Sequence, residues 1–345
     1  MKRRWRYLLL LCLLLLGAAA AGLVWVGIRS LDEPVHLAAP MRFKVVPGAR
    51  FARVAAQLAV QGVIAHPRAW VVFARLRNLA PAVKAGEYEI QPGITPRELL
   101  AKMVNGQVLL HSFTIVDGWT VRDLLEALRR NPDVTITLAE QVPDLMEKLG
   151  FPGLAAEGQF LPETYRFIAG TTDAELLRQA HAALTKELAA DWAGRDPGLP
   201  LQSPQELLIM ASIVEKESGL PEEVKIIAGL YLHRLSIGMR LQADPTVIYG
   251  MGDRYDGDIK TVDLRTDGPY NSYTRAGLPP TPIALAGAAA IRATAHPEKT
   301  EAIYFVASPK GDGSHVFSAT LQEHNAAVAS YVAHQRRKAA EEGPR

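Results

Sequence analysis

The stretch SPQELLIMASIVEKESG, residues 203–219, is the part of the sequence that decides the fold. Ser203 suits the N-cap of a helix, Pro204 its first position and Glu206 its third, so the serine and the glutamate can form a reciprocal capping box. Gly219, which a proline follows two residues later, ends the helix. These signals predict a short buried helix that ends in carboxylates.

One face of this helix is apolar until its last turn. Four residues follow one another at spacings of three, four and three, which places them on one stripe: Leu207, Met210, Val214 and Glu217. A carboxyl at the end of such a stripe is partly removed from water, which raises its pKa toward that of a general acid. Glu217 is therefore a candidate catalytic acid, and an ion-paired structural glutamate is the alternative interpretation.

Glu215 is the other carboxylate near the end of this helix. It lies two residues from Glu217, so the two side chains point about 200° apart around the helix. They cannot both act on the same bond, and we expect Glu215 to be solvated.

The composition sets limits on the function. The chain has 345 residues, enough for about two domains besides a membrane segment. Its net charge of +2 is too small to indicate a nucleic-acid partner. Cys12 is the only cysteine, which excludes an intrachain disulfide and a cysteine-based metal site. The nine histidines do not fall at metal-binding spacings, so we predict neither a metal nor a cofactor.

The N-terminus predicts a single-pass membrane anchor. Residues 1–6, MKRRWR, are basic and cytoplasmic in this interpretation, and residues 7–28 form an uncharged apolar run long enough to cross a bilayer as a helix. A cleaved signal peptide is the alternative, but the apolar run continues past the small residues at 18–22. We therefore expect a protein of the cell inner membrane whose body, after a tether at residues 29–41, lies in the periplasm or its extracytoplasmic equivalent.

Two folded parts follow the tether, which makes the predicted fold class α+β. Residues 42–106 read as strand, helix, helix, strand and helix, an order that resembles a LysM-like module. Residues 107–333 form a larger mixed α+β domain, predicted to be catalytic. It includes helices at 121–130, 174–192, 222–237 and 288–296, strands at 108–116, 303–306 and 314–318, and a terminal helix from Thr320. We expect the helix at 222–237 to bury Tyr231 in the core and to expose Arg234. Residues 334–345 are a charged tail.

Two predicted loops of the larger domain are rich in amide, hydroxyl and aromatic groups. They are LQADPTVIYGMG at residues 241–252 and PYNSYTRAGLPPTPI at residues 269–283. Such groups can hold an uncharged sugar polymer through hydrogen bonds and stacking, although Asp244 and Asn271 are also ordinary turn formers. No serine-nucleophile elbow, P-loop or dinucleotide motif is present, so carboxylate acid/base chemistry is the remaining option.

Several sequence blocks together resemble one family, the YceG-like (MltG) endolytic murein transglycosylases. The blocks are EGQFLPETY at 157–165, ASIVEKES at 211–218, HRLSIGMRLQADPTVIYGMG at 233–252, YNSYTRAGLPPTPI at 270–283 and HVFSATLQEHN at 315–325. The resemblance implies a membrane-anchored enzyme that cuts nascent peptidoglycan strands internally, between N-acetylmuramic acid and N-acetylglucosamine. It also implies peptidoglycan synthases, the penicillin-binding proteins, as partners.

The resemblance also implies site residues. The second glutamate of the Glu-Lys-Glu block is catalytic in the family, and it corresponds here to Glu217. Further residues match the family's polar blocks and are candidate substrate-binding residues: Gln242, Asp244, Thr246, Tyr249, Tyr270, Asn271 and Tyr273. The absence of a second acid on the helical stripe favours a lyase, and Asp244 or Glu163 is the residue that would serve a lysozyme-like hydrolase. A non-catalytic, membrane-tethered wall-binding scaffold is the third hypothesis.

Overall fold

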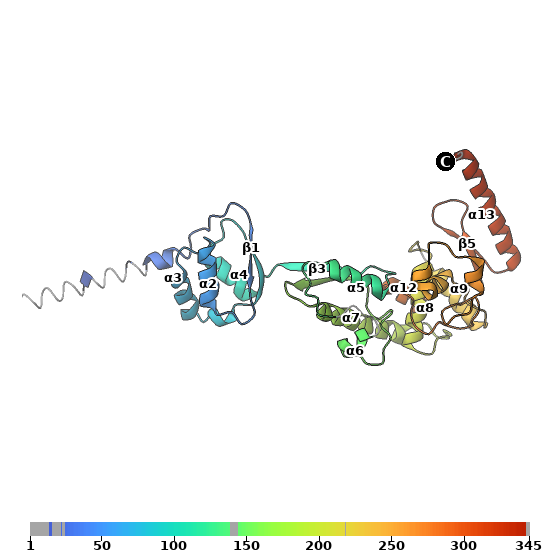
Figure 1. Cartoon of the computed structure of the whole chain (residues 1–345), viewed down its shortest axis with the longest axis horizontal. Helices are drawn as coiled ribbons and strands as arrows, with labels where there is room; N and C mark the ends of the chain where they lie inside the picture. The colour runs from blue at the N-terminus through green and yellow to red at the C-terminus, as the bar shows by residue number, and fades with distance from the viewer. Residues whose placement is uncertain (1–13, 16–21, 23–24, 139–143, 218, 343–345) are drawn as a thin grey trace, which may run out of the picture. The chain divides into compact units, whose positions relative to one another are not determined.

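The structure is a computed structural model that describes residues 14–15, 22, 25–138, 144–217 and 219–342. These residues divide into two compact units, one formed by the chain up to residue 111 together with residues 166–171, the other by residues 112–165 and the chain from 172 onward (Figure 1). Helices and strands occur in both units, which confirms the predicted mixed α+β class.

The predicted membrane span at residues 7–28 lies largely outside the described residues. Residues 25–29, which are described, are helical. Over the described ranges, no helix combines the length and the apolar character that crossing a membrane requires. The anchor therefore stays a prediction.

The first unit has the predicted order of strand, two helices, strand and helix. Its elements are β1 (Met41–Val45), α2 (Phe51–Val60), α3 (Pro67–Leu76), a 3₁₀ turn (Ala80–Ala82), β2 (Gly86–Ile90) and α4 (Pro96–Asn105). The two strands are antiparallel, with Phe43 opposite Tyr88. Trp70 and Tyr88 are fully buried in the core, and the Trp70 indole N–H donates to the carbonyl of Pro96 at 2.9 Å.

The chain from residue 110 onward, which holds the second unit, is built mainly from helices, and its strands at 110–114 and 164–168 have residues in both units. Elements from residue 110 onward are β3 (Leu110–Thr114), α5 (Val121–Arg130), α6 (Leu145–Leu149), β4 (Thr164–Ile168), α7 (Asp173–Gly194), α8 (Pro204–Glu217), α9 (Val224–Ser236), α10 (Asp244–Met251), a 3₁₀ turn (Gly252–Arg254), α11 (Thr261–Arg265), α12 (Ala288–Ala295), β5 (Tyr304–Ala307), β6 (His315–Ser318) and α13 (Leu321–Glu342). The strands form two-stranded sheets, β3 with β4 and β5 antiparallel to β6.

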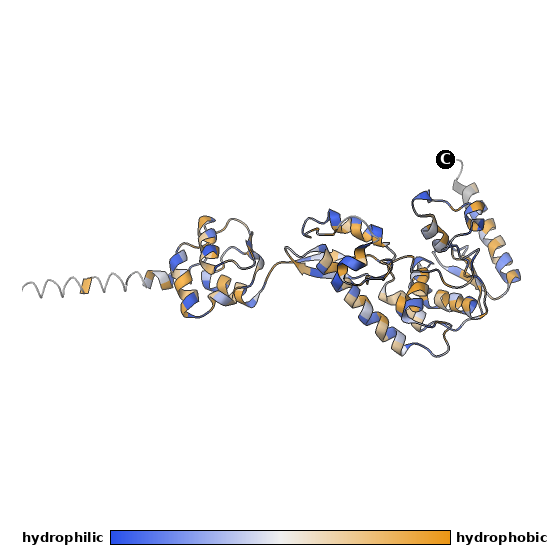
Figure 2. Cartoon of the chain, turned by 60° about the horizontal axis from the view of Figure 1, so that its bottom comes forward, coloured by the Kyte–Doolittle hydropathy of each residue, from blue (hydrophilic) through white to orange (hydrophobic). Residues whose placement is uncertain are grey.

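Helix α8 is the centre of the second unit, as the opening stretch predicts. All eight residues from 207 to 214 are buried, so the apolar surface is wider than one stripe. Helices α7, α9, α10 and α12 pack around it. Figure 2 shows this part of the chain as a group of helices in which orange, apolar residues alternate with blue, hydrophilic ones. The last turn of α8 therefore reaches its site from a rigid, close-packed base.

The start of α8 differs in one detail from the predicted capping box. The Ser203 hydroxyl accepts from the Glu206 N–H at 3.2 Å, as expected. The Glu206 carboxylate accepts from the Gln202 N–H at 2.6 Å instead of from Ser203. The Glu206 carboxylate thus caps the backbone N–H one residue before the N-cap position that we predicted. A full reciprocal box does occur at α4, where Thr95 and Glu98 bond to each other's backbone N–H.

Several elements were not expected from the sequence. Residues 244–251, predicted as loop, form helix α10, because a proline at a first-turn position starts a helix as readily as it ends one. Strand β4 was also missed, although its alternation of exposed and buried residues, with Tyr165 and Phe167 inward, is typical of a strand. The tail predicted from residue 334 continues helix α13 to Glu342.

We predict that Leu207→Ala, in the centre of α8, destabilises the second unit by about 2 to 5 kcal/mol, because it removes buried methyl groups where the surrounding helices cannot collapse. Leu321→Ala is the matched control, since Leu321 is 56% exposed in the same unit. Urea denaturation of both variants measures the free energy of unfolding. Equal losses in the two variants would contradict the central place of α8.

Candidate active site

Glu217 is the last residue of α8, and its carboxyl is turned toward α9. The Tyr231 hydroxyl, on α9, donates to Glu217 Oε1 at 2.7 Å. Burial raises the pKa of Glu217 to about 7, because the apolar surroundings disfavour the charged form. The direction is the one predicted from the helical stripe. The carboxyl can therefore hold a proton near neutral pH and release it to a bound group.

Four neighbours modify the pKa of Glu217 beyond burial. The Tyr231 hydrogen bond lowers it by stabilising the carboxylate, and the negative charge of Asp244 raises it. The positive charges of His315 and Arg234 lower it again. Burial and the charge of Asp244 therefore favour the protonated acid, whereas Tyr231, His315 and Arg234 favour its anion.

Asp244 and Tyr273 meet beside Glu217. The Tyr273 hydroxyl donates to Asp244 Oδ1 at 2.6 Å. Burial, the bond to Asp244 and then the charges of Asp244 and Glu217 raise the pKa of Tyr273, so its hydroxyl stays protonated. Two of the candidate substrate-binding residues are thus placed next to Glu217, and Asp244 is an exposed second carboxylate there.

Gln242 and Thr246 lie where the segment before α10 meets the loop around residue 272. Gln242 has a φ of 50°, in the left-handed region that non-glycine residues rarely adopt, and its N–H donates to the Ser272 carbonyl at 3.2 Å. The Thr246 hydroxyl is fully buried and donates to the Ala243 carbonyl at 2.7 Å, with Ser272 Oγ at 2.8 Å. Thr246 therefore holds the two segments together, and the backbone strain at Gln242 marks their junction.

Asn271 also organises its own loop. Its side-chain N–H groups donate to the carbonyls of Thr266 at 2.7 Å and Asp263 at 3.0 Å. Its Oδ1 accepts from the Tyr273 N–H at 2.9 Å. The amide of Asn271 is thus occupied within the protein, where it fixes the backbone that carries Tyr273.

Tyr249 and Tyr270 form a second group of polar aromatics. Their rings meet edge to face with centroids 4.8 Å apart. The Tyr249 hydroxyl donates to Glu157 Oε2 at 3.2 Å, and the Tyr270 hydroxyl lies 2.8 Å from Thr281 Oγ1. Burial raises the pKa of Glu157 to about 7 as well. We did not predict this carboxyl from the sequence, because its segment has no helical or strand periodicity.

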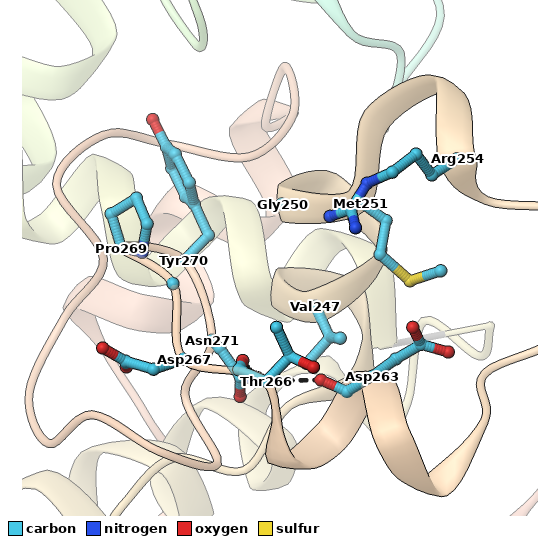
Figure 3. A pocket seen from close by; sticks show the side chains of 11 residues that line it. Val247, Gly250, Met251, Arg254, Asp263, Thr266, Asp267, Pro269, Tyr270 and Asn271 are labelled. Atoms are coloured by element: carbon cyan, nitrogen blue, oxygen red, sulfur yellow. Dashed lines mark hydrogen bonds between the residues drawn. The ribbon is translucent and has the colours of Figure 1, made fainter.

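A hollow lies at the far end of α10 from Asp244. Figure 3 shows Val247, Gly250 and Met251 on one side of it, with Tyr270 and Asn271 on another. Since α10 rises about 1.5 Å per residue, Gly250 lies roughly 9 Å along the helix from Asp244. Polar and aromatic surface therefore continues from the carboxylates along α10.

Glu215 is not solvated, contrary to our expectation. Its Oε2 accepts from the Gly287 N–H at 3.0 Å, at the N-cap of helix α12, where a carboxylate is electrostatically favourable. Burial raises the pKa of Glu215. The hydrogen bond from Gly287 lowers this pKa, and the negative charge of Asp117 raises it further. A Cβ atom at position 287 would lie 2.3 Å from Asp117 Oδ1, so a glycine at this position leaves room for the Asp117 carboxylate. Glu215 therefore holds α12 to α8.

Arg234, Tyr231 and His315 are site residues that sequence reasoning missed. Arg234 was expected on the exposed face of its helix, but it is 6% exposed. It donates to the Ile303 carbonyl at 2.6 Å and to the Leu241 carbonyl. Tyr231 was assigned to the core, and its hydroxyl was not considered as a partner of Glu217. Only three-dimensional proximity to Glu217 distinguishes these residues from ordinary helix and strand positions.

Among the residues that the structure describes, no group of three or more His, Cys, Asp or Glu side chains could hold a metal ion.

The fold and the site together define a class, an α+β protein whose central helix ends in two half-buried carboxyls of raised pKa, one of which, that of Glu217, lies beside polar aromatic loops. A model of the YceG-like family matches residues 43–330, and the chain belongs to this family.

Related proteins agree with this assignment. An endolytic murein transglycosylase of Bacillus subtilis (strain 168) is 28% identical over 330 residues, which cover 90% of each chain. A protein of the same name from Streptococcus pneumoniae (strain D39) is 26% identical over 319 residues, 83% of this chain and 57% of that protein. A yceG-like protein of Listeria monocytogenes with a solved crystal structure matches with a TM-score of 0.51 at 26% identity, covering 83% of this chain and 98% of that one.

We predict that Glu217→Gln stabilises the second unit at about pH 8 and has little effect at about pH 5. The pKa of Glu217 is raised to about 7 in the folded state, above the ordinary value of 4.5 for a glutamate side chain. The stability that its proton contributes is therefore present below the unfolded pKa and lost as the pH rises through about 7. The uncharged amide avoids this loss, which amounts to up to about 3 kcal/mol.

Thermal unfolding at both pH values measures the effect, with Glu298→Gln at an exposed position of the same unit as the control. A stability difference for Glu217→Gln that is the same at both pH values would show that the carboxyl titrates as an ordinary exposed group.

Proposed function

We propose that this protein is an endolytic lytic transglycosylase of peptidoglycan. It cuts glycan strands internally between N-acetylmuramic acid and N-acetylglucosamine, leaves 1,6-anhydro-N-acetylmuramic acid ends, and so ends strand elongation. The observation that carries the proposal is the buried carboxyl of Glu217, whose pKa is raised to about 7 at the end of a rigid helix. Membership of the YceG-like family and the names of the two relatives support the same activity.

The proposed reaction uses Glu217 first as acid and then as base. Its protonated carboxyl gives a proton to the glycosidic oxygen as the bond from that oxygen to muramic acid C1 breaks, and the leaving sugar departs with a hydroxyl. The C6 hydroxyl of the same muramic acid then attacks C1 and returns its proton to Glu217. The C1–O6 bond replaces the glycosidic bond, no water is consumed, and Glu217 ends in its starting state.

The neighbours of Glu217 fit the two halves of this cycle. Burial keeps the carboxyl protonated before the bond breaks, and the Tyr231 hydroxyl stabilises the anion that follows. The negative charge of Asp244, held by Tyr273, can stabilise positive charge that develops at C1 in an oxocarbenium-like transition state. Asp244 in this role acts without forming a bond.

Asp244 is also the observation that favours a second candidate, a lysozyme-like peptidoglycan hydrolase. A hydrolase needs a second carboxylate as nucleophile or to activate water, and Asp244 is close enough to Glu217 to raise its pKa. Glu163, the other candidate for this role, is exposed in the segment before β4 and has no such effect on Glu217. The two candidates differ in their products, since a hydrolase leaves reducing ends.

The cellular setting belongs to the same proposal. We propose that residues 7–28 anchor the chain in the inner membrane, with residues 1–6 cytoplasmic and the body after the 29–41 tether outside the cytoplasm. Residues 42–106 would then serve as a LysM-like wall-binding module and residues 107–333 as the catalytic domain. Cutting nascent strands requires access to the place where they are made, so peptidoglycan synthases are the proposed partners.

We predict that Glu217→Gln abolishes release of glycan fragments from peptidoglycan, because the amide has no proton to donate. Glu215→Gln is the matched control, since its amide oxygen can still accept from the Gly287 N–H. It should retain most of the wild-type activity. Mass spectrometry of the digested glycan, with circular dichroism to verify folding, measures both variants.

The same spectra separate the candidate functions. The lyase gives anhydro ends, whereas reducing ends would transfer the assignment to a hydrolase that uses Asp244. Glycan binding with no cleavage by the folded wild-type protein would instead indicate a wall-binding scaffold.

A further inference from the structure

A histidine–carboxylate pair is connected to Glu217 through two aromatic rings and takes no part in the proton transfers of the proposed reaction. Glu223, buried at the N-cap of α9, accepts two hydrogen bonds from His315, the first residue of β6. The His315 backbone N–H lies 2.8 Å from Glu223 Oε1, and the ring Nδ1 lies 2.6 Å from Oε2. Since an ionised carboxylate only accepts, this geometry places a proton on Nδ1.

Aromatic contacts connect this pair to Glu217. The His315 ring meets the Phe305 ring edge to face at 5.3 Å, and Phe305 meets the Tyr231 ring edge to face at 6.1 Å. Tyr231 in turn donates to Glu217. The β5–β6 hairpin is therefore packed against α9, whose Tyr231 bonds to Glu217, and a positive charge on His315 lowers the pKa of that carboxyl.

We propose that Glu223 and His315 form a positioning dyad that stabilises the anionic form of Glu217 between the two proton transfers. Glu223 fixes the ring and its Nδ1 proton, and the ring in its protonated form places a positive charge near the Glu217 carboxylate. The inference rests on the proposed function, because it assigns the dyad to the interval between the acid step and the base step.

The reaction gives a reason for such a dyad. Burial makes Glu217 a good holder of a proton but a poor anion, so proton donation leaves a charge where water cannot stabilise it. A cation nearby lowers the free energy of that state.

The groups that face Glu217 come from four elements. The pKa of Glu217 responds to Tyr231 and Arg234 from α9, Asp244 from α10 and His315 from β6, and the charge of Glu217 in turn raises the pKa of Tyr273 in the following loop. Arg234 is a permanent cation, held by two backbone carbonyls. The negative charge of Asp244 destabilises the anion of Glu217. Histidine is the side-chain type that gains and loses its charge near neutral pH. His315 is therefore the cation near Glu217 whose charge depends on pH.

Two substitutions separate the electrostatic role from a structural one. In Glu223→Gln the amide oxygen can still accept from the His315 N–H and hold the hairpin, but the amide nitrogen is a donor and cannot accept from Nδ1. His315 must then turn Nδ1 into an acceptor, which disfavours its charged form. His315→Gln removes the charge altogether. His296→Gln is the matched control, since His296 Nδ1 lies 2.8 Å from Asp196 in a comparable pair.

The experiment measures kcat on purified glycan strands across pH with the full-length chain, and the titration of the Glu217 carboxyl by carbon-13 NMR without substrate. The Glu217 resonance is assigned by its loss in Glu217→Gln. We expect both dyad variants to lower kcat by about tenfold, to move the loss of activity to higher pH, and to raise the NMR midpoint of Glu217, because a nearby cation that favoured the anion is gone. His296→Gln should match the wild type in all three.

Two results would overturn the dyad. A lower kcat with an unchanged pH limb and an unchanged NMR midpoint would make the pair only an anchor for the hairpin. Wild-type behaviour in both variants would remove it from the site. The NMR titration needs no enzymatic activity, so it tests the dyad independently of the reaction. If the wild-type protein released no anhydro product, the proposed function would fail, but the NMR test of the dyad would still hold.

Discussion

The burial of one carboxyl, that of Glu217, is the constraint on which the rest of the site depends. A carboxyl removed from water holds its proton to a higher pH, and here its pKa is raised to about 7. That position is maintained because α8 is buried from residue 207 to residue 214 and cannot shift to expose its last turn. Holding an ionisable group where its charged form is unfavourable lowers the free energy of unfolding, which is a common feature of functional sites.

Each element around α8 has a distinct relation to that carboxyl. Helix α9 supplies the hydroxyl of Tyr231 and the charge of Arg234, while α10 and the loop after it supply Asp244 and Tyr273. The β5–β6 hairpin contributes His315 from the end of the chain. Segments separated by about a hundred residues thus converge on one atom group, and the packing of α8 against α9, α10 and α12 makes the convergence possible.

The sequence was informative where local rules apply and silent where only the fold decides. The capping residues and apolar spacing predicted α8, and helix geometry predicted that Glu217 and Glu215 point apart, as their different hydrogen-bond partners, Tyr231 and Gly287, show. The same reasoning misjudged Glu215, because its partner is the N–H of Gly287, 72 residues away. Arg234 was expected on the surface for a similar reason, since the carbonyls that bind it belong to other segments. His315 had no helical or metal spacing to distinguish it, and its role depends on Glu223, in a different part of the chain.

The central claim is that Glu217 alone serves as acid and base, with the sugar's own hydroxyl in place of water. The most direct test is cleavage of glycan strands in water enriched in oxygen-18, followed by mass spectrometry of the new ends. Our account predicts anhydro ends that contain no oxygen-18 from the solvent, because the C1–O6 bond forms within the muramic acid. Incorporation of one solvent oxygen at C1 in the primary product would contradict it.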